Sequence, residues 1–143
     1  MITEDRKRHM FGVAEFLRHY AQEQKLPQQD CYELYTLGLL HDIGYAFLEE
    51  PDYHQHETVG GKFLKKQNYP YWQEVYYHGV VNCPYQSRFL NLLNWADLHV
   101  DSKGNMVSYE ERLADIARRH QTSSLTFNHA KQLVAELKAK GYE

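Results

Sequence analysis

The pair His41-Asp42, which closes the apolar run Leu37-Gly38-Leu39-Leu40, is the part of this chain best suited to chemistry. A carboxylate in an apolar setting is costly to bury unless a cation or hydrogen-bond donors accompany it. Imidazole and carboxylate groups are also ligands that divalent metal ions select. The pair therefore predicts a metal site, provided that other residues supply the remaining ligands.

Inward-facing polar residues recur on the other predicted helices. His9 shares a helix face with apolar residues, and Asp97 interrupts an apolar stripe. The full set is His9, His41, Asp42, His56, His78 and Asp97. Buried groups of this kind need partners, and shared metal ions would satisfy all of them. Four imidazoles and two carboxylates are enough for two first-row metal ions with one bridging carboxylate, and they differ from the closed tetrahedral set of structural zinc.

The order and the local contexts of these residues resemble the HD-domain superfamily, an all-α group of metal-dependent phosphohydrolases. The resemblance is to the HDIG-type signature and the binuclear branch, and it covers about residues 6–103. The segments that carry it are Arg8-His9-Met10, Gly38-Leu39-Leu40-His41-Asp42-Ile43-Gly44, His56-Glu57-Thr58-Val59-Gly60-Gly61, Tyr77-His78-Gly79 and Trp95-Ala96-Asp97. It implies that His9, His41, Asp42 and Asp97 hold one metal ion, and that His56 and His78 hold a second, with Asp42 bridging.

The resemblance also implies the reaction. Hydroxide held by the metal ions would be the nucleophile, with His41 and Asp42 as the catalytic ligands, and the substrate would be a small phosphorylated molecule such as a nucleotide. Iron or manganese is the expected metal, with other first-row ions or magnesium as alternatives. Lys62 and Arg88 are predicted to bind the substrate phosphate from their places in the sequence. The alternative functions are a di-iron oxygenase acting on an organophosphonate or polyol, and a non-catalytic regulatory module stabilised by metal.

The spacing of apolar residues is helical almost throughout and predicts an all-α fold. We expect a compact single-domain bundle of about six to seven helices over residues 1–143. The predicted helices cover about residues 5–24, 28–43, 54–67, 70–79, 86–101, 108–120 and 125–140. The second helix is predicted to end at Gly44, the third to break or bend at Gly60-Gly61, and Ser108 to begin a capping box with Glu111. The helices over about 108–141 carry no ligand and either complete the core or form an interface.

Residues beside the predicted ligands have more than one interpretation. Glu57 is either a proton shuttle or an ordinary first-turn carboxylate, and Asp101 either orients a ligand or ends a helix. His99 is expected at the surface, with a place at the pocket mouth as the alternative. The other histidines, His19, His54, His120 and His129, are expected to be structural or exposed. The tyrosine-rich stretch 69–77 either lines a pocket or forms the edge of the core.

The composition favours a cytoplasmic protein, and the small-molecule partner is what the resemblance implies. With 16 Lys and Arg against 19 Asp and Glu, the net charge is −3, which argues against a nucleic-acid polymer as a partner. No signal peptide or membrane span is visible, so we expect no membrane association. Cys31 and Cys83 fit a reduced compartment better than a disulfide framework. Association into a homodimer is compatible with all these features.

Overall fold

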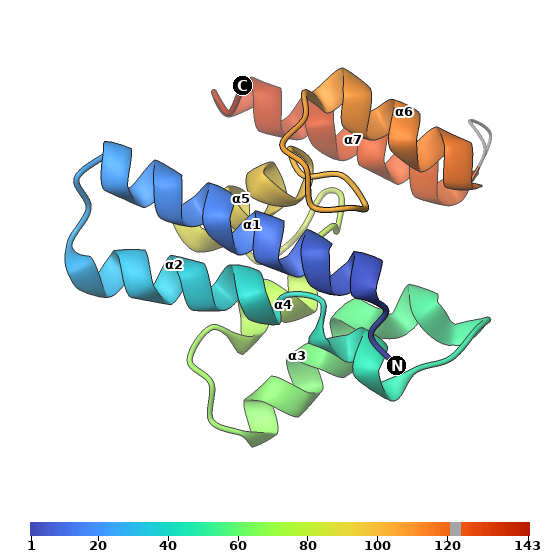
Figure 1. The fold of residues 1–143 in the computed structure, drawn as a ribbon, viewed down its shortest axis with the longest axis horizontal. Coiled ribbons are helices and arrows are strands. Elements are labelled where there is room, and N and C mark those ends of the chain that lie inside the picture. The colour runs from blue at the N-terminus through green and yellow to red at the C-terminus, as the bar shows by residue number, and fades with distance from the viewer. Residues whose placement is uncertain (121–123) are drawn as a thin grey trace.

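The computed structural model of the protein describes residues 1–120 and 124–143, which form an all-α fold (Figure 1). Seven α-helices and two short 3₁₀-helices occur in these residues. They are α1 (Glu4–Glu23), α2 (Gln28–Leu40), η1 (Ile43–Phe47), η2 (Asp52–Gln55), α3 (His56–Lys66), α4 (Trp72–Tyr77), α5 (Arg88–Asp97), α6 (Tyr109–His120) and α7 (Leu125–Ala139). The only extended pairing in the described residues is an isolated bridge between Val100 and Met106. The prediction of a compact all-α fold is confirmed.

Helix α1 is the centre of the arrangement. It packs along α2 and crosses α5, while α6 and α7 lie on its other side (Figure 1). The main core lies between these helices, and its fully buried side chains include Val13, Leu17, Leu37 and Leu93. A second cluster of buried residues, among them Leu98, joins α6 and α7 to the end of α5. The C-terminal helices thus pack on the rest of the chain through their own apolar contacts.

Close backbone contacts allow the ligand-bearing segments to meet. A Cβ atom on Gly38 would lie 2.5 Å from the Cα of Ala14, so glycine permits α2 to approach α1 closely. A Cβ atom on Gly44 would lie 1.9 Å from the carbonyl oxygen of His56, so η1 can touch the start of α3 only with glycine there. Both contacts bring the His41-Asp42 pair close to histidines on other helices.

Several predicted helix boundaries are wrong. Helix α2 ends at Leu40, before the predicted end at 43, and Gly44 lies within η1 instead of ending the helix. Helix α3 runs without a break through Gly60-Gly61, although Gly61 does permit a close approach, to Tyr76 of α4. Helix α5 stops at Asp97. These boundaries depend on contacts between segments, which helical periodicity does not report.

The predicted capping box at α6 is confirmed. The Glu111 backbone N–H donates to Ser108 Oγ at 3.1 Å, and the Ser108 N–H donates to Glu111 Oε1 at 3.1 Å. This reciprocal pair satisfies two donors that the first turn of a helix leaves free. It sets the start of the helix that brings Arg112 to the functional site.

The tyrosine-rich stretch forms the edge of the core. Tyr69, Tyr71 and Trp72 pack against the main buried cluster, and the Tyr71 hydroxyl donates to Glu33 Oε2 at 2.5 Å. The interpretation as a core edge is therefore the one that the packing supports.

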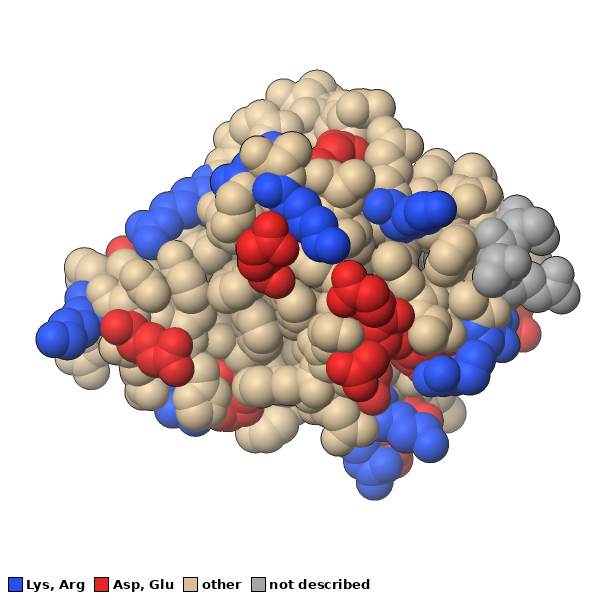
Figure 2. Space-filling view, turned by 90° about the horizontal axis from the view of Figure 1, so that it is seen from above, with Lys and Arg blue, Asp and Glu red and all other residues tan. Residues whose placement is uncertain are grey.

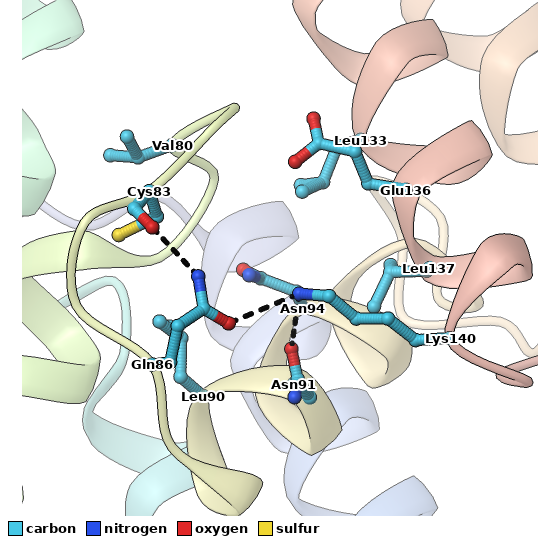
Figure 3. A pocket seen from close by; sticks show the side chains of 10 residues that line it. All are labelled: Val80, Cys83, Gln86, Leu90, Asn91, Asn94, Leu133, Glu136, Leu137 and Lys140. Carbon is cyan, nitrogen blue, oxygen red and sulfur yellow. Dashed lines mark hydrogen bonds between the residues drawn. The ribbon is translucent and has the colours of Figure 1, made fainter.

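The seam between α5, α7 and the loop after α4 is closed by polar contacts (Figure 3). Lys140 Nζ donates to Gln86 Oε1 at 3.2 Å and to Asn91 Oδ1 at 3.1 Å. The space that remains is about 10 Å³, enough for about one water molecule. This pocket is therefore too small to bind a substrate.

The surface carries both signs of charge. Basic and acidic side chains are interspersed on the face shown in Figure 2. Among the described residues, no helix combines the length and the apolar character needed to cross a bilayer. Cys31 and Cys83 are free thiols.

Candidate metal site

The six predicted ligands come together, and most of them lie at helix ends. His41 and Asp42 follow the last residue of α2, His56 is the first residue of α3, and Asp97 is the last residue of α5. His78 follows α4, and His9 lies within α1. His9, His41, Asp42 and His78 are buried, while the side chains of His56 and Asp97 are 14 % and 21 % exposed. The centre is therefore largely shielded from solvent, with His56 and Asp97 as its most exposed members.

Each imidazole of the site is oriented by a backbone carbonyl. Nδ1 of His9 lies 2.9 Å from the Asp101 carbonyl oxygen, and Nδ1 of His41 lies 2.7 Å from that of Gly38. Nδ1 of His56 lies 2.9 Å from the Tyr53 carbonyl oxygen, and Nδ1 of His78 lies 2.6 Å from that of Val75. A carbonyl oxygen only accepts hydrogen bonds, so each Nδ1 carries a proton and donates it. In the neutral ring, Nε2 then presents its lone pair to the centre, which is the tautomer that binds a metal ion.

Asp42 lies between two pairs of imidazoles. Its Oδ2 is 3.3 Å from Nε2 of His41 and 3.8 Å from Nε2 of His9. Its Oδ1 is 3.3 Å from Nε2 of His56 and 3.2 Å from Nε2 of His78. One carboxylate therefore faces two separate sets of nitrogen donors, with one oxygen toward each.

Asp97 completes the set around His9 and His41. Its Oδ1 lies 2.7 Å from Nε2 of His9 and 3.5 Å from Nε2 of His41. Arg112 of α6 approaches from the other side: its Nε donates to the Asp97 carbonyl at 3.2 Å, and its Nη2 lies 3.9 Å from Asp97 Oδ1. Arg112 thus holds Asp97 in position.

The sequence analysis missed Arg112. Its position nevertheless carries a signal, because it shares the buried face of α6 with Tyr109, Asp115 and Ile116. An arginine and an aspartate three residues apart on the buried face of a helix need each other as partners. Arg112 Nη1 donates to Asp115 Oδ2 at 3.0 Å.

The charges of the site stabilise one another. Burial alone raises the pKa of Asp42, but the His41 imidazole and hydrogen bonds from His56 and His78 lower it well below its usual value. Burial lowers the pKa of His41, but the carboxylates of Asp42 and Asp97 raise it well above its usual value. The imidazoles thus favour ionised carboxylates and the carboxylates favour charged imidazoles, and a metal ion would take the place of that positive charge on binding.

The donor set fits metal ions. Three overlapping groups have ligand atoms within 4.8 Å of one another: His9, His41 and Asp97; His41, Asp42 and His78; and His56, Glu57 and His78. His41 Nε2 is buried and has no hydrogen-bond partner among the described residues. An unsatisfied buried nitrogen is costly, and a metal ion would satisfy it.

Lys62 and Arg88 lie away from this cluster. Lys62 is exposed on α3, and Arg88 is exposed at the first residue of α5. No ion pair or hydrogen bond within residues 1–120 and 124–143 joins either of them to the six residues. Their role in binding substrate stays a prediction.

The neighbouring residues have distinct roles. The predicted helix-end position of Asp101 is wrong, because α5 already ends at Asp97. In the turn that follows, the Asp101 carboxylate accepts hydrogen bonds from the N–H groups of Lys103 and Asn105, while its carbonyl orients His9. The expected surface position of His99 is wrong, because its ring is partly buried and bonds to the carbonyls of Val107 and Glu143.

The histidines expected outside the site are exposed. These are His19, His54, His120 and His129. Helix-face periodicity therefore separated them correctly from the six inward residues.

These features define an all-α protein with a buried histidine and aspartate cluster suited to metal ions. Comparison with known families identifies one, the HD domain, whose sequence profile matches residues 6–138. The chain belongs to the HD-domain family, whose members are generally metal-dependent hydrolases of the phosphohydrolase type. No curated protein and no solved structure matches the chain.

Proposed function

We propose that this protein is a binuclear metal-dependent phosphohydrolase that cleaves a phosphoester of a small molecule such as a nucleotide. The observation that carries the proposal is the position of Asp42, whose two oxygens face different pairs of imidazoles. His9, His41 and Asp97 would hold one ion with Oδ2 of Asp42. His56 and His78 would hold the second with Oδ1.

When bound, the ions would lower the pKa of a water molecule and neutralise charge on the phosphoryl oxygens. The chain supplies a group for proton transfer beside His56. Glu57 Oε1 lies 3.3 Å from Nε2 of His56, and the Glu57 side chain is 27 % exposed. A carboxylate that touches both the site and solvent is placed to take a proton from the attacking water or to give one to the leaving group.

Tyr45 keeps the His56 ring in place. The two rings stack with centroids 4.2 Å apart and an interplanar angle of 12°. Burial raises the pKa of Tyr45, and the charges of Asp42 and Glu57 raise it further, so the hydroxyl stays protonated at neutral pH. Tyr45 therefore offers a hydrogen-bond donor at the wall of the site.

The proposal is tested by phosphate release from manganese- or iron-loaded protein with a panel of nucleotides and other phosphoesters. We expect turnover that is lost in His41→Ala and Asp42→Asn, while His54→Ala, at an exposed histidine, retains it. Glu57→Gln should lower kcat by about 10²- to 10⁴-fold, which is the usual contribution of a general acid or base. Circular dichroism of each variant checks that it folds.

Two outcomes would overturn the proposal. Oxygen consumption by reduced, iron-loaded protein on an organophosphonate or polyol, without phosphate release, would establish the oxygenase alternative. No turnover of any substrate, together with unfolding when the metal is removed, would establish a regulatory module.

A further inference from the structure

A group of arginines lies beside the metal site and is not used by the proposed metal chemistry. It contains Arg6 of α1 and Arg112 and Arg119 of α6. The guanidinium carbon of Arg6 lies 3.8 Å from the ring centroid of Tyr45, and Tyr45 in turn stacks on His56. The Tyr45 ring therefore lies between Arg6 and the predicted ligand His56.

The α6 arginines share a single buried carboxylate. Asp115 Oδ2 lies 3.0 Å from Arg112 Nη1 and 4.0 Å from Arg119 Nη2, and its Oδ1 lies 3.3 Å from Arg118 Nη2. Arg112 is also 3.9 Å from Oδ1 of Asp97. One carboxylate cannot balance three guanidinium groups, so this end of α6 keeps an excess of positive charge next to Asp97.

Arg6 and Arg119 extend from two helices that meet at Asp97. Arg6 is three residues before His9, whose Nε2 lies 2.7 Å from Asp97 Oδ1, and Arg119 is seven residues after Arg112, whose Nη2 lies 3.9 Å from the same oxygen. Burial and the charge of Arg112 lower the pKa of Arg119, and the charge of Arg6 lowers it further, while Asp115 and the Tyr45 hydroxyl oppose them. Arg6 makes no ion pair with any described residue, whereas its neighbours Lys7 and Arg8 pair with Glu4 and Asp5. Two arginines that repel each other near one tyrosine favour an anion between them.

We propose that Arg6 and Arg119 form an anion subsite at the edge of the metal site, and that this subsite binds a second phosphate group of the substrate. This inference rests on the proposed function, in which the metal ions take the phosphoryl group that is cleaved. Guanidinium groups bind phosphate oxygens through paired N–H donors, and Arg6 is held beside the site by its contacts with the rings of Tyr45 and Tyr53. The substrate class is therefore a small molecule with at least two phosphate groups.

The probes are inorganic pyrophosphate and inorganic phosphate, titrated calorimetrically into manganese-loaded protein. We expect pyrophosphate to bind at least about tenfold more tightly than phosphate, because it adds charge-assisted hydrogen bonds to the arginines. Arg6→Gln and Arg119→Gln should each weaken pyrophosphate binding by about three- to tenfold, since Arg119 is partly exposed. Phosphate binding should change by less than about twofold.

Arg118→Gln is the matched control. Arg118 pairs with the same Asp115, lies one residue from Arg119 and has a side chain that is 71 % exposed. The control removes the same charge from the same helix. Because the Arg118 side chain is more exposed and its charge is screened by solvent, Arg118→Gln should leave pyrophosphate binding within about twofold of the wild type. Arg119→Lys should recover part of the affinity. Metal content and thermal stability of each variant check that the site is intact, and any removal of manganese by pyrophosphate in solution is the same for all variants.

Three results would overturn the inference. The first is equal affinity of the wild type for pyrophosphate and phosphate. The second is an equal loss of pyrophosphate affinity in Arg118→Gln and Arg119→Gln, and the third is an equal loss of affinity for both anions in Arg119→Gln. The two proposals fail separately. A preference for pyrophosphate that depends on Arg6 and Arg119, without hydrolysis of any phosphoester, supports the subsite and refutes the proposed function. Hydrolysis of phosphoesters without a preference for pyrophosphate supports the proposed function and refutes the subsite.

Discussion

Substitution of Asp42 by asparagine tests the central feature of the site. Asp42→Asn keeps the shape of the side chain and removes its charge. The carboxylate oxygens lie between 3.2 and 3.8 Å from four Nε2 atoms, two for each oxygen. If both oxygens are ligands, the substitution weakens both metal ions together. Loss of a residue that only supports a ligand already costs about 10- to 100-fold in metal affinity, so we expect at least about 100-fold for each ion.

The same substitution should remove the stabilisation by metal. An ion at a free concentration 100 times its dissociation constant stabilises the folded state by about 2.7 kcal/mol, and two such ions by about 5 kcal/mol. In a domain of this size, 1 kcal/mol corresponds to about 2–4 °C in Tm. Addition of EDTA should therefore lower the Tm of the wild type by about 10–20 °C, and that of Asp42→Asn by only a few degrees.

The measurements are metal content per chain after gel filtration and thermal melting with and without EDTA. We expect about two ions in the wild type, fewer than one in Asp42→Asn and about one in His78→Ala, whose imidazole faces only Oδ1. His54→Ala, at an exposed position, is the control and should keep both ions. Two ions in Asp42→Asn, or an unchanged response to EDTA, would refute the bridging position. Loss of both ions in His78→Ala would show that the two sets of ligands are not separate.

Three further substitutions test the surroundings by urea denaturation. Gly44→Ala should cost about 2–3 kcal/mol, because its Cβ would lie 1.9 Å from the carbonyl oxygen at the start of α3; an unchanged free energy of unfolding would contradict this packing. Arg112→Met should cost about 3 kcal/mol, since it removes the buried ion partner of Asp115 and leaves its carboxylate with the exposed Arg118 and Arg119 and the Ser102 N–H, and a stabilised variant would contradict it. Tyr71→Phe should cost about 1 kcal/mol at neutral pH through its bond to Glu33. Hydrogen bonds from Gln29 and Tyr71 lower the pKa of Glu33 in the folded state, so this contribution is present above about pH 4.3 and disappears as the pH falls further; a pH-independent difference would be evidence against it.

The helix faces of the six site residues were predictable because a helix face is a local property. His9 lies on the buried face of α1 with Val13 and Leu17, and the 3.6-residue period shows this without any knowledge of other helices. The same reasoning placed His54 outside and His56 inside, although only one residue lies between them. The start of α6 was also predictable, since the two hydrogen bonds of a capping box depend on neighbouring residues alone.

The features that the sequence did not reveal depend on contacts between distant segments. Gly44 suggested the end of a helix, whereas its structural role is the contact between η1 and α3. His99 was expected at the surface, but the chain terminus and the strand-like segment near Val107 cover it. Arg112 belongs to a polar pair on a helix face that another helix buries. In each case the contacting residue is distant in sequence, and helical periodicity describes only residues that are close in sequence.

The placement of ligands at helix ends explains how this small fold prepares its imidazoles. His41, His56 and His78 each donate from Nδ1 to the carbonyl three residues earlier, at the end of a helical segment. Each of these carbonyls lies in the last turn of its segment, and those of Tyr53 and Val75 accept from the ring as well as from the backbone N–H of the same histidine, as the two lone pairs of a carbonyl oxygen allow. The chain needs no distant residue to select the tautomer of these three rings.

His9 lies inside a helix, where the preceding carbonyls are already bonded, and it requires a distant acceptor. The Asp101 carbonyl fills this role at 2.9 Å. The turn that presents the carbonyl is held by the Asp101 carboxylate, which accepts from the N–H groups of Lys103 and Asn105. The orientation of His9 therefore depends on the segment that links α5 to α6, the same segment whose Ser102 N–H donates to Asp115. Through this turn, the helix that carries Arg112 and Arg119 is connected to the geometry of the candidate metal site.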